Sequence, residues 1–342
     1  MTPPTTMARE PATLAFRAMN TNVTLQVVAD GDAATEALTS AAWVFDRTER
    51  ACTRFDPVSP LMQANAAPDE WHEVPPECFM AVQEAFRAHL LTGGLFDPRV
   101  LRALVDLGYD RTLPFGLGDV EIPDAREPSG LAAAPPGRTP TGGAAPRSWQ
   151  PRFDGARNAV RLGPDPVDLG GIGKGLAVRW AARQLARAGS VYLVDAGGDC
   201  RLGGGGPEGD GWRVGIEDPT GQPLPIAVLG LHDASVATSS TAARTWRAGG
   251  VRRHHVIDPR SGTSADSGLV SVTVVGDDPA DAEVWSKALL ITGPEAAHDL
   301  CTRHGLAALW VHGDGRVGTS APIRPLLRWS RDPVDGGDGD DG

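Results

Sequence analysis

The chain has 342 residues, of which 41% are hydrophobic, so it is long enough to build one large domain or two ordinary ones around a sizeable core. Its formal net charge of -11 and its pI near 5.2 argue against a nucleic-acid partner, because binding to a phosphate backbone requires a clustered excess of Lys and Arg. Only two of the 32 Lys and Arg residues are lysines, Lys174 and Lys287, and the sequence around each indicates its role.

The first half of the chain predicts one strand and two helices. Residues 23–28 alternate polar and apolar side chains as a half-buried strand does, and residues 35–50 place apolar side chains on one face as an amphipathic helix does. A second helix is predicted over residues 76–91. Gly93 and Gly94 follow it, and glycine permits the left-handed conformation that ends many helices.

The second half predicts a sheet core and two further helices. Asp278 and Pro279 predict a helix start, because the Asp side chain can cap the first N–H groups and proline suits the first helical position. Another helix is predicted from Pro294 to Gly305. Strands and helices neither alternate strictly nor segregate, which predicts a mixed α/β (α+β) fold. The strands of the sheet core are predicted at residues 191–195, 212–216, 269–275 and 307–312.

One domain is predicted over residues 19–330, between two end segments. Residues 1–18 are predicted to be a flexible N-terminal segment, and residues 331–342 a disordered acidic tail. Residues 113–150 are rich in Pro, Gly and Ala and lack periodicity. They predict a disordered insertion, because such a stretch buries too little apolar surface to offset the entropy lost on ordering it.

The cysteines and the absence of targeting segments predict a cytoplasmic protein. The four cysteines lie far apart without CxxC spacing or neighbouring histidines, as buried free thiols in a reducing compartment do. The N-terminal region has no apolar stretch typical of an export signal, and no uncharged apolar run approaches the roughly 20 residues that span a bilayer. The cysteines are Cys52, Cys78, Cys200 and Cys301.

A glycine-rich turn at residues 168–175 (DLGGIGKG) precedes an expected helix that continues to residue 189. Such a turn exposes backbone N–H groups at the positive end of the helix dipole, and Lys174 adds a full positive charge. The spacing matches neither a P-loop nor a Rossmann fingerprint. Two interpretations therefore stand: a phosphate site, or a helix-packing turn that binds no ligand.

Two further polar segments are candidates for chemistry. Residues 194–204 place an acidic residue and paired glycines at the end of a predicted strand, where α/β sheets often receive ligands. Residues 253–263 combine His254, His255 and Asp258 on a predicted loop. Either histidine can serve as a general base because imidazole titrates near neutral pH, and the alternative is a solvated histidine pair.

In chain order, these and other segments resemble those of the FAD:protein FMN transferases, the ApbE-type flavin transferases. The resemblance extends from about Met19 to Arg324 and is interrupted at residues 113–150. Asn20 stands where the family has glycine, and Phe55 where it has tyrosine. The segments are AMNTNVTLQV (18–27), TRFDPVSPLMQAN (53–65), GLFDP (94–98), DLGGIGKG (168–175), VDAGGD (194–199), ATSST (237–241) and HHVIDPRSG (254–262).

The resemblance implies a mixed α/β fold of the T-fold-like kind and an enzyme that moves FMN from FAD to a threonine hydroxyl of a target protein. A phosphoester bond forms, AMP is released, and the target is usually a subunit of a redox complex. His255 is implied as the acid/base, with Asp258 near the reacting centre and Lys287 as a further catalytic candidate. The residues implied along FAD are Met19, Phe55, Leu95, Phe96, Asp97, Asp168, Lys174, Thr238 and Ile257.

The family's magnesium site is where this sequence departs from the pattern. The family uses an aspartate and a threonine four residues apart, helped by a carbonyl of the glycine-rich turn; the corresponding residues here are Glu283, Lys287 and Gly171. A charged lysine has no lone pair for Mg²⁺. Three explanations remain open: Lys287 neutralises the pyrophosphate itself, a displaced ion binds through Glu283, Asp281 and Gly171, or Glu283 and Lys287 form only an i, i+4 ion pair.

Two other functions remain open at this point. Water could attack the same phosphate, which would make the protein an FAD pyrophosphatase giving FMN and AMP. The altered metal helix also allows a non-enzymatic protein that binds or carries FAD. Covalent mass gain on an acceptor peptide, AMP release without that gain, or retention of intact FAD would distinguish the three.

Overall fold

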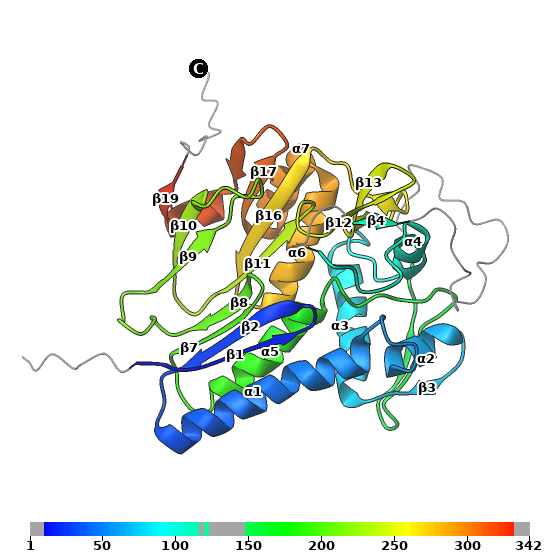
Figure 1. Ribbon diagram of the computed structural model, residues 1–342, viewed down its shortest axis with the longest axis horizontal. Coiled ribbons are helices and arrows are strands. Elements are labelled where there is room, and N and C mark those ends of the chain that lie inside the picture. The colour runs from blue at the N-terminus through cyan, green and yellow to red at the C-terminus, as the bar shows by residue number, and fades with distance from the viewer. Residues whose placement is uncertain (1–9, 116–119, 123–147, 332–342) are drawn as a thin grey trace, which may run out of the picture.

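A computed structural model of the chain describes residues 10–115, 120–122 and 148–331. Its centre is an eight-stranded sheet in which every neighbouring pair is antiparallel. Helices pack on one face of this sheet (Figure 1). The strands, in order across the sheet, are β1 (Ala12–Ala18), β2 (Thr21–Val27), β7 (Tyr192–Ala196), β8 (Asp199–Gly203), β11 (Ser235–Ser240), β16 (Leu269–Gly276), β17 (Ala307–His312) and β18 (Val317–Thr319).

The helical face of the sheet carries two apolar clusters. At one end, Leu25 of β2 and Val194 of β7 pack against α1 (Gly31–Cys52) and α5 (Gly173–Leu185). At the other, Val272 and Val274 of β16 pack against α6 (Pro279–Thr292) and α7 (Pro294–His304). Val272 and Val274 are two residues apart in one strand, so their side chains point to the same face of the sheet.

The opposite face is covered by a small sheet. Val275 of β16 and Val236 of β11 contact a three-stranded sheet of order β19-β10-β9 and a 3₁₀ helix, η1 (Ala321–Leu326). The small strands are β9 (Trp212–Ile216), β10 (Ala227–Leu231) and β19 (Leu327–Ser330). The molecule is therefore layered, with helices on one face of the main sheet and a second sheet on the other.

A smaller part of the chain lies beside the helical layer and helps to form the site. It contains α2 (Pro60–Ala66), α3 (Pro76–Leu91) and α4 (Leu101–Asp106) (Figure 1). Its short strands pair as β3-β6-β5, β13-β12-β4 and β14-β15. They are β3 (His72–Glu73), β4 (Glu121–Ile122), β5 (Arg152–Asp154), β6 (Ala159–Arg161), β12 (Thr245–Ala248), β13 (Val251–His254), β14 (Ile257–Asp258) and β15 (Thr263–Ser264).

The structure confirms the mixed fold and the principal predicted elements. The predicted strand at 23–28 is β2, and the predicted helices are α1, α3, α6 and α7. Asp278 caps α6 as expected, because its side chain accepts hydrogen bonds from two N–H groups of the first turn. Gly305 ends α7 in the left-handed conformation. In the described residues, no helix has both the length and the apolar character needed to cross a membrane.

Three predictions are wrong in detail. The segment at 212–216 belongs to the small sheet, not to the main one, because its apolar side chains pack on η1 and β10. Residues 12–18, placed in a flexible segment, form β1 and pair along their whole length with β2. The ends of the expected insertion are ordered, since Trp149 is 2% exposed and packs in the core. Residues 1–9, 116–119, 123–147 and 332–342 lie outside the described residues.

Candidate functional site

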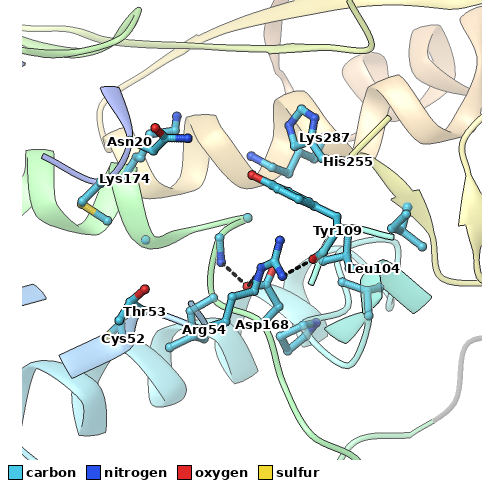
Figure 2. Close-up of a pocket in the computed structure, with 18 of the residues that line it drawn as sticks. Asn20, Cys52, Thr53, Arg54, Leu104, Tyr109, Asp168, Lys174, His255 and Lys287 are labelled. Atoms are coloured by element: carbon cyan, nitrogen blue, oxygen red, sulfur yellow. Dashed lines mark hydrogen bonds and ion pairs between the residues drawn. The ribbon is translucent and has the colours of Figure 1, made fainter. Parts of the chain in front are cut away.

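A cavity of about 310 Å³ opens between the glycine-rich turn, the C-terminal end of α1, the loop after α3 and helix α6 (Figure 2). Most residues that the sequence points to line it. These are Met19, Phe55, Leu95, Phe96, Asp97, Asp168, Gly171, Lys174, His255, Ile257 and Lys287. The fold thus brings segments that lie far apart in the sequence together around one cavity.

Three of the residues that the resemblance assigns to the site do not line the cavity. The Thr238 hydroxyl lies 2.9 Å from the Thr273 hydroxyl inside the sheet. The carboxylate of Asp258 accepts hydrogen bonds from the Arg260 guanidinium. Glu283 lies beneath the cavity wall with only 1% of its side chain exposed. Of these three, Glu283 contacts lining residues directly, through Lys174 and Lys287.

The glycine-rich turn is shaped by close approaches that a side chain would prevent. A Cβ on Gly171 would lie 2.9 Å from the Phe96 ring, and a Cβ on Gly175 would lie 2.6 Å from the backbone of Ala280 on α6. Both distances are shorter than real Cβ contacts. The turn leads directly into α5, so Lys174 sits at the positive end of that helix. Glycine here permits α5 and α6 to meet and keeps the wall open.

A buried charge cluster joins α5, β8 and α6 beneath the cavity. Lys174 pairs with Asp199 and lies 3.6 Å from Glu283, and the Lys287 ammonium lies 3.1 Å from the same Glu283 oxygen. The other Glu283 oxygen accepts a hydrogen bond from the Gly175 N–H at 2.8 Å. Burial lowers the pKa of Lys174 to about 8, against the opposing effect of Glu283. Burial alone would raise the pKa of Glu283, but the charges of Lys287 and Lys174 hold it below its usual value.

His255 lies in the same wall as these lysines. Burial first, and then the charges of Arg244 and Lys287, lower its pKa well below the usual value for histidine. This shift favours the neutral imidazole at pH 7, and among the described residues its buried Nδ1 has no hydrogen-bond partner. His254 instead faces away, with its Nε2 2.9 Å from the Ala265 carbonyl oxygen. Both histidines are half-buried, so they are not a solvated pair, and of the two His255 lines the cavity.

The opposite wall of the cavity contains residues that the sequence analysis did not single out. The Arg54 guanidinium lies 4.2 Å from the ring centroids of both Phe55 and Tyr109. Its Nε is 3.4 Å from the Asp168 carboxylate, and it donates a hydrogen bond to the Tyr109 carbonyl (Figure 2). Tyr109 and Arg244 also line the cavity. Only the position of Arg54 beside Phe55 in a recognised segment could have indicated its role.

The turn between β1 and β2 explains one departure from the family pattern. Met19 and Asn20 both have positive φ, 50° and 58°, in a two-residue hairpin connection. Hairpins of this kind favour glycine and asparagine, so Asn20 fills the glycine position at a small cost. The Met19 N–H donates to the Glu49 carboxylate at 2.9 Å, which fixes the turn at the cavity rim.

The residues at the expected magnesium position do not fit the ion. Mg²⁺ requires oxygen ligands in near-octahedral geometry at about 2.0–2.1 Å. Both oxygens of Glu283 are engaged, and Lys287 supplies no acceptor. The Asp281 carboxylate is paired with Arg87. Among the described residues, no group of three or more His, Cys, Asp or Glu side chains forms a metal site.

Comparison with known proteins agrees with this architecture. The ApbE family model matches residues 19–310. The FAD:protein FMN transferase of Escherichia coli K12 is 36% identical over 151 residues, covering 44% of this chain and 43% of that protein. The FAD:protein FMN transferase of Treponema pallidum is 36% identical over 189 residues, covering 51% of this chain and 52% of that protein. The aligned part thus spans about half the length of these curated relatives, or less.

Solved structures of related proteins share the fold over a larger part of the chain. The crystal structure of the ApbE protein from Thermotoga maritima has a TM-score of 0.77 and 26% identity, and the match covers 94% of this chain and all of that one. The flavin transferase ApbE from Vibrio cholerae has a TM-score of 0.72 and 22% identity, with 93% of this chain and 99% of that chain covered. With the family match over most of its length, this chain belongs to the ApbE family.

Proposed function

We propose that this protein is an FAD:protein FMN transferase, which moves FMN from FAD to a threonine hydroxyl of a target protein and releases AMP. The proposal is supported by the family assignment and by the chemistry of the cavity. FAD is the donor substrate, and the acceptor is a protein with an accessible threonine. The target proposed from the family resemblance is a subunit of a redox complex.

The cavity combines two surfaces, one that suits the ring of a flavin nucleotide and one that suits its phosphates. One surface is apolar and aromatic, with Phe55, Leu95 and Ile257 among its residues. Such a surface suits the flat flavin ring. The other carries the positive charges of Lys174 and Lys287, which suit the pyrophosphate. A ligand with an apolar ring joined to phosphates would satisfy both surfaces at once.

The position of His255 beside Lys174 and Lys287 in one cavity is the single observation that carries the proposal, and the lowered pKa of His255 favours its neutral form. A neutral imidazole can accept the proton of a threonine hydroxyl as its oxygen attacks phosphorus. The new bond joins the threonine oxygen to the phosphate of FMN, and the bond to the AMP oxygen breaks. The lysines stabilise the negative charge that develops on the phosphates and on the departing AMP.

The state of the cysteines supports a cytoplasmic location for this reaction. Cys52, Cys78, Cys200 and Cys301 are all free thiols, which suits a reducing compartment. FAD and a newly made acceptor protein would meet the enzyme there. Fractionation of cells that produce the tagged protein tests the location, and recovery with the envelope fraction would contradict it.

The proposed function is tested by mixing the purified protein with FAD and a peptide that carries one acceptor threonine. The expected result is a covalent FMN adduct on the peptide, measured by mass spectrometry, with one AMP released per adduct. The matched control is the same peptide with valine in place of threonine, which should gain no mass. AMP release without an adduct would indicate FAD hydrolysis, and intact FAD would indicate a binding protein; either result contradicts transfer.

A further inference from the structure

We propose that the Lys287 ammonium takes the place of a divalent cation in this active site, so that FAD binding and FMN transfer proceed without Mg²⁺. The inference deepens the proposed function and rests on it for the identity of the donor. It concerns Lys287, one of the residues at which this chain departs from the family pattern. Four structural observations support it, and each is independent of whether an ion is present.

The first observation is where the lysine stem lies. A Cβ on Gly171 would be 3.5 Å from Cδ and 3.6 Å from Cε of Lys287. The Lys287 stem therefore occupies the space where a side chain on Gly171 would reach, and both residues line the cavity. A divalent ion shared by the turn and α6 would need this same space. The lysine stem already fills part of it.

The second observation is that the oxygen ligands at this position are committed to other partners. One oxygen of Glu283 accepts a hydrogen bond from the Lys287 ammonium, and the other accepts one from the Gly175 N–H. Asp281, the other carboxylate on this part of α6, pairs with Arg87 and lies 3.9 Å from Arg179. An arriving ion would have to displace these partners and approach two ammonium groups. The displaced-ion explanation therefore lacks a ligand set.

The third observation is that the Glu283–Lys287 contact is more than an exposed i, i+4 pair. The Glu283 side chain is 1% exposed and that of Lys287 is 15% exposed. Exposed pairs of this spacing add only a few tenths of a kcal/mol, and they need no pocket. Here the carboxylate is buried, and the ammonium lies at the cavity wall. The carboxylate holds the ammonium where a phosphate can reach it.

The fourth observation is the positive charge available around the same wall. Lys174 and Arg244 line the cavity with Lys287, and the charges of all three depress the pKa of His255. An ammonium offers three N–H donors, of which Glu283 takes one. The remaining donors can bind phosphate oxygens. Fixed cations can thus supply the charge neutralisation that a metal ion supplies in related chemistry.

The experiment measures FAD binding by flavin fluorescence and FMN transfer by peptide mass, each in EDTA and in excess MgCl₂. For the natural sequence, we expect affinity and rate to agree within about 2-fold between the two conditions. A loss of FAD binding in EDTA that Mg²⁺ restores would overturn the inference. If FAD binds equally in both conditions but no adduct forms in either, the proposed transfer fails while the metal-independent binding stands.

Two substitutions at this position sharpen the test. Lys287→Met keeps the stem but removes the charge, and should weaken FAD binding roughly 10- to 100-fold with or without Mg²⁺, the usual effect of losing a hydrogen bond to a charged group. Lys287→Thr restores a hydroxyl and frees one Glu283 oxygen, and should make FAD binding depend on Mg²⁺. If Lys287→Met binds FAD as tightly as the natural sequence, Lys287 does not contact the phosphates.

A matched control separates this local effect from the loss of one positive charge anywhere on the protein. Arg183→Met makes the same kind of change at an exposed residue near the end of α5. Its FAD affinity and its response to EDTA should equal those of the natural sequence. Circular dichroism of each variant confirms folding, and thermal shift with MgCl₂ alone reports ion binding without reference to activity. A shift for Lys287→Thr but not for the natural sequence is the expected pattern.

Discussion

The buried carboxylate of Glu283 on α6 accepts a hydrogen bond from the backbone N–H of Gly175 on α5 at 2.8 Å. This contact joins the start of one helix to the middle of the other. The same carboxylate also faces Lys174 and Lys287. One side chain therefore fixes the backbone of the glycine-rich turn and the positions of both lysines at once.

The close approach of the two helices predicts that Gly175→Ala destabilises the protein. A Cβ at this position would lie 2.6 Å from both the Pro279 carbonyl oxygen and the Ala280 Cα. Backbone atoms can move aside only at a cost in energy, so we expect the free energy of unfolding to fall by about 1–3 kcal/mol. Urea denaturation measures this change. Gly31→Ala is the control, because a Cβ on Gly31 meets no atom within 4 Å; an equal loss in both variants would contradict the packing argument.

The free ring nitrogen of His255 predicts a separation of catalysis from binding. His255→Gln removes the proton acceptor, and we expect FMN transfer to fall about 10²–10⁴-fold, the usual contribution of general acid–base catalysis. FAD affinity should change little, because the lysines remain. His254→Gln is the matched control, since His254 does not line the cavity. Rates measured with saturating FAD test this, and equal losses in the two variants would remove His255 from the reaction.

The pKa shifts predict the pH profile of kcat/KM, which reports the free enzyme. The pKa of His255 is well below its usual value, so the imidazole stays neutral and active as the pH falls through 6.5. Lys174 has a pKa of about 8, so its charge is lost as the pH rises past that value. We expect a rate that is level near pH 7, falls above about pH 8, and falls on the acid side only well below 6.5.

The same shift at His255 predicts a dependence of stability on pH. Below pH 6.5 the unfolded chain takes up a proton at this residue, while the folded protein does not until the lowered pKa is reached. The free energy of unfolding should therefore decrease as the pH falls through this window. Thermal denaturation of the natural sequence and of His255→Gln measures it. A pH dependence that is the same in both proteins would assign the effect to other groups.

The wall formed by Arg54 predicts that its planar guanidinium cannot be replaced by another cation. Arg54→Lys keeps the charge but cannot both cover the Phe55 and Tyr109 rings and reach Asp168. We expect FAD affinity to fall about 10-fold, as an aromatic wall and a buried carboxylate lose their partner. Fluorescence titration measures it.

The control for Arg54 is the same substitution at a nearby exposed residue. Arg50→Lys changes a side chain that is 76% exposed and pairs with Asp46 on the same helix. Its FAD affinity should match that of the natural sequence. If Arg54→Lys also binds FAD normally, the guanidinium plane is not needed to hold the wall in place.

Local chemistry in the sequence determined most elements and the candidate residues. The cap formed by Asp278, the stop at Gly305 and the alternation in β2 are encoded within a few residues, so they could be predicted without a fold. Several short segments also resemble those of the family and follow in the same order, and this resemblance placed Lys174 and Lys287 in one site. The elements followed from residue type and spacing, whereas the family and its site residues followed from the resemblance.

Only the tertiary structure decided how the side chains are paired. Glu283 lies 108 residues after Gly175, and Tyr109 lies 55 residues after Arg54, so no local pattern reveals either contact. The position of β9 in a second sheet likewise depends on which apolar face it covers. The family resemblance placed a lysine at the position of the family's metal-binding threonine. The fold decided that its ammonium is held by a buried carboxylate against the glycine-rich turn, because burial and charge pairing are properties of the packed chain.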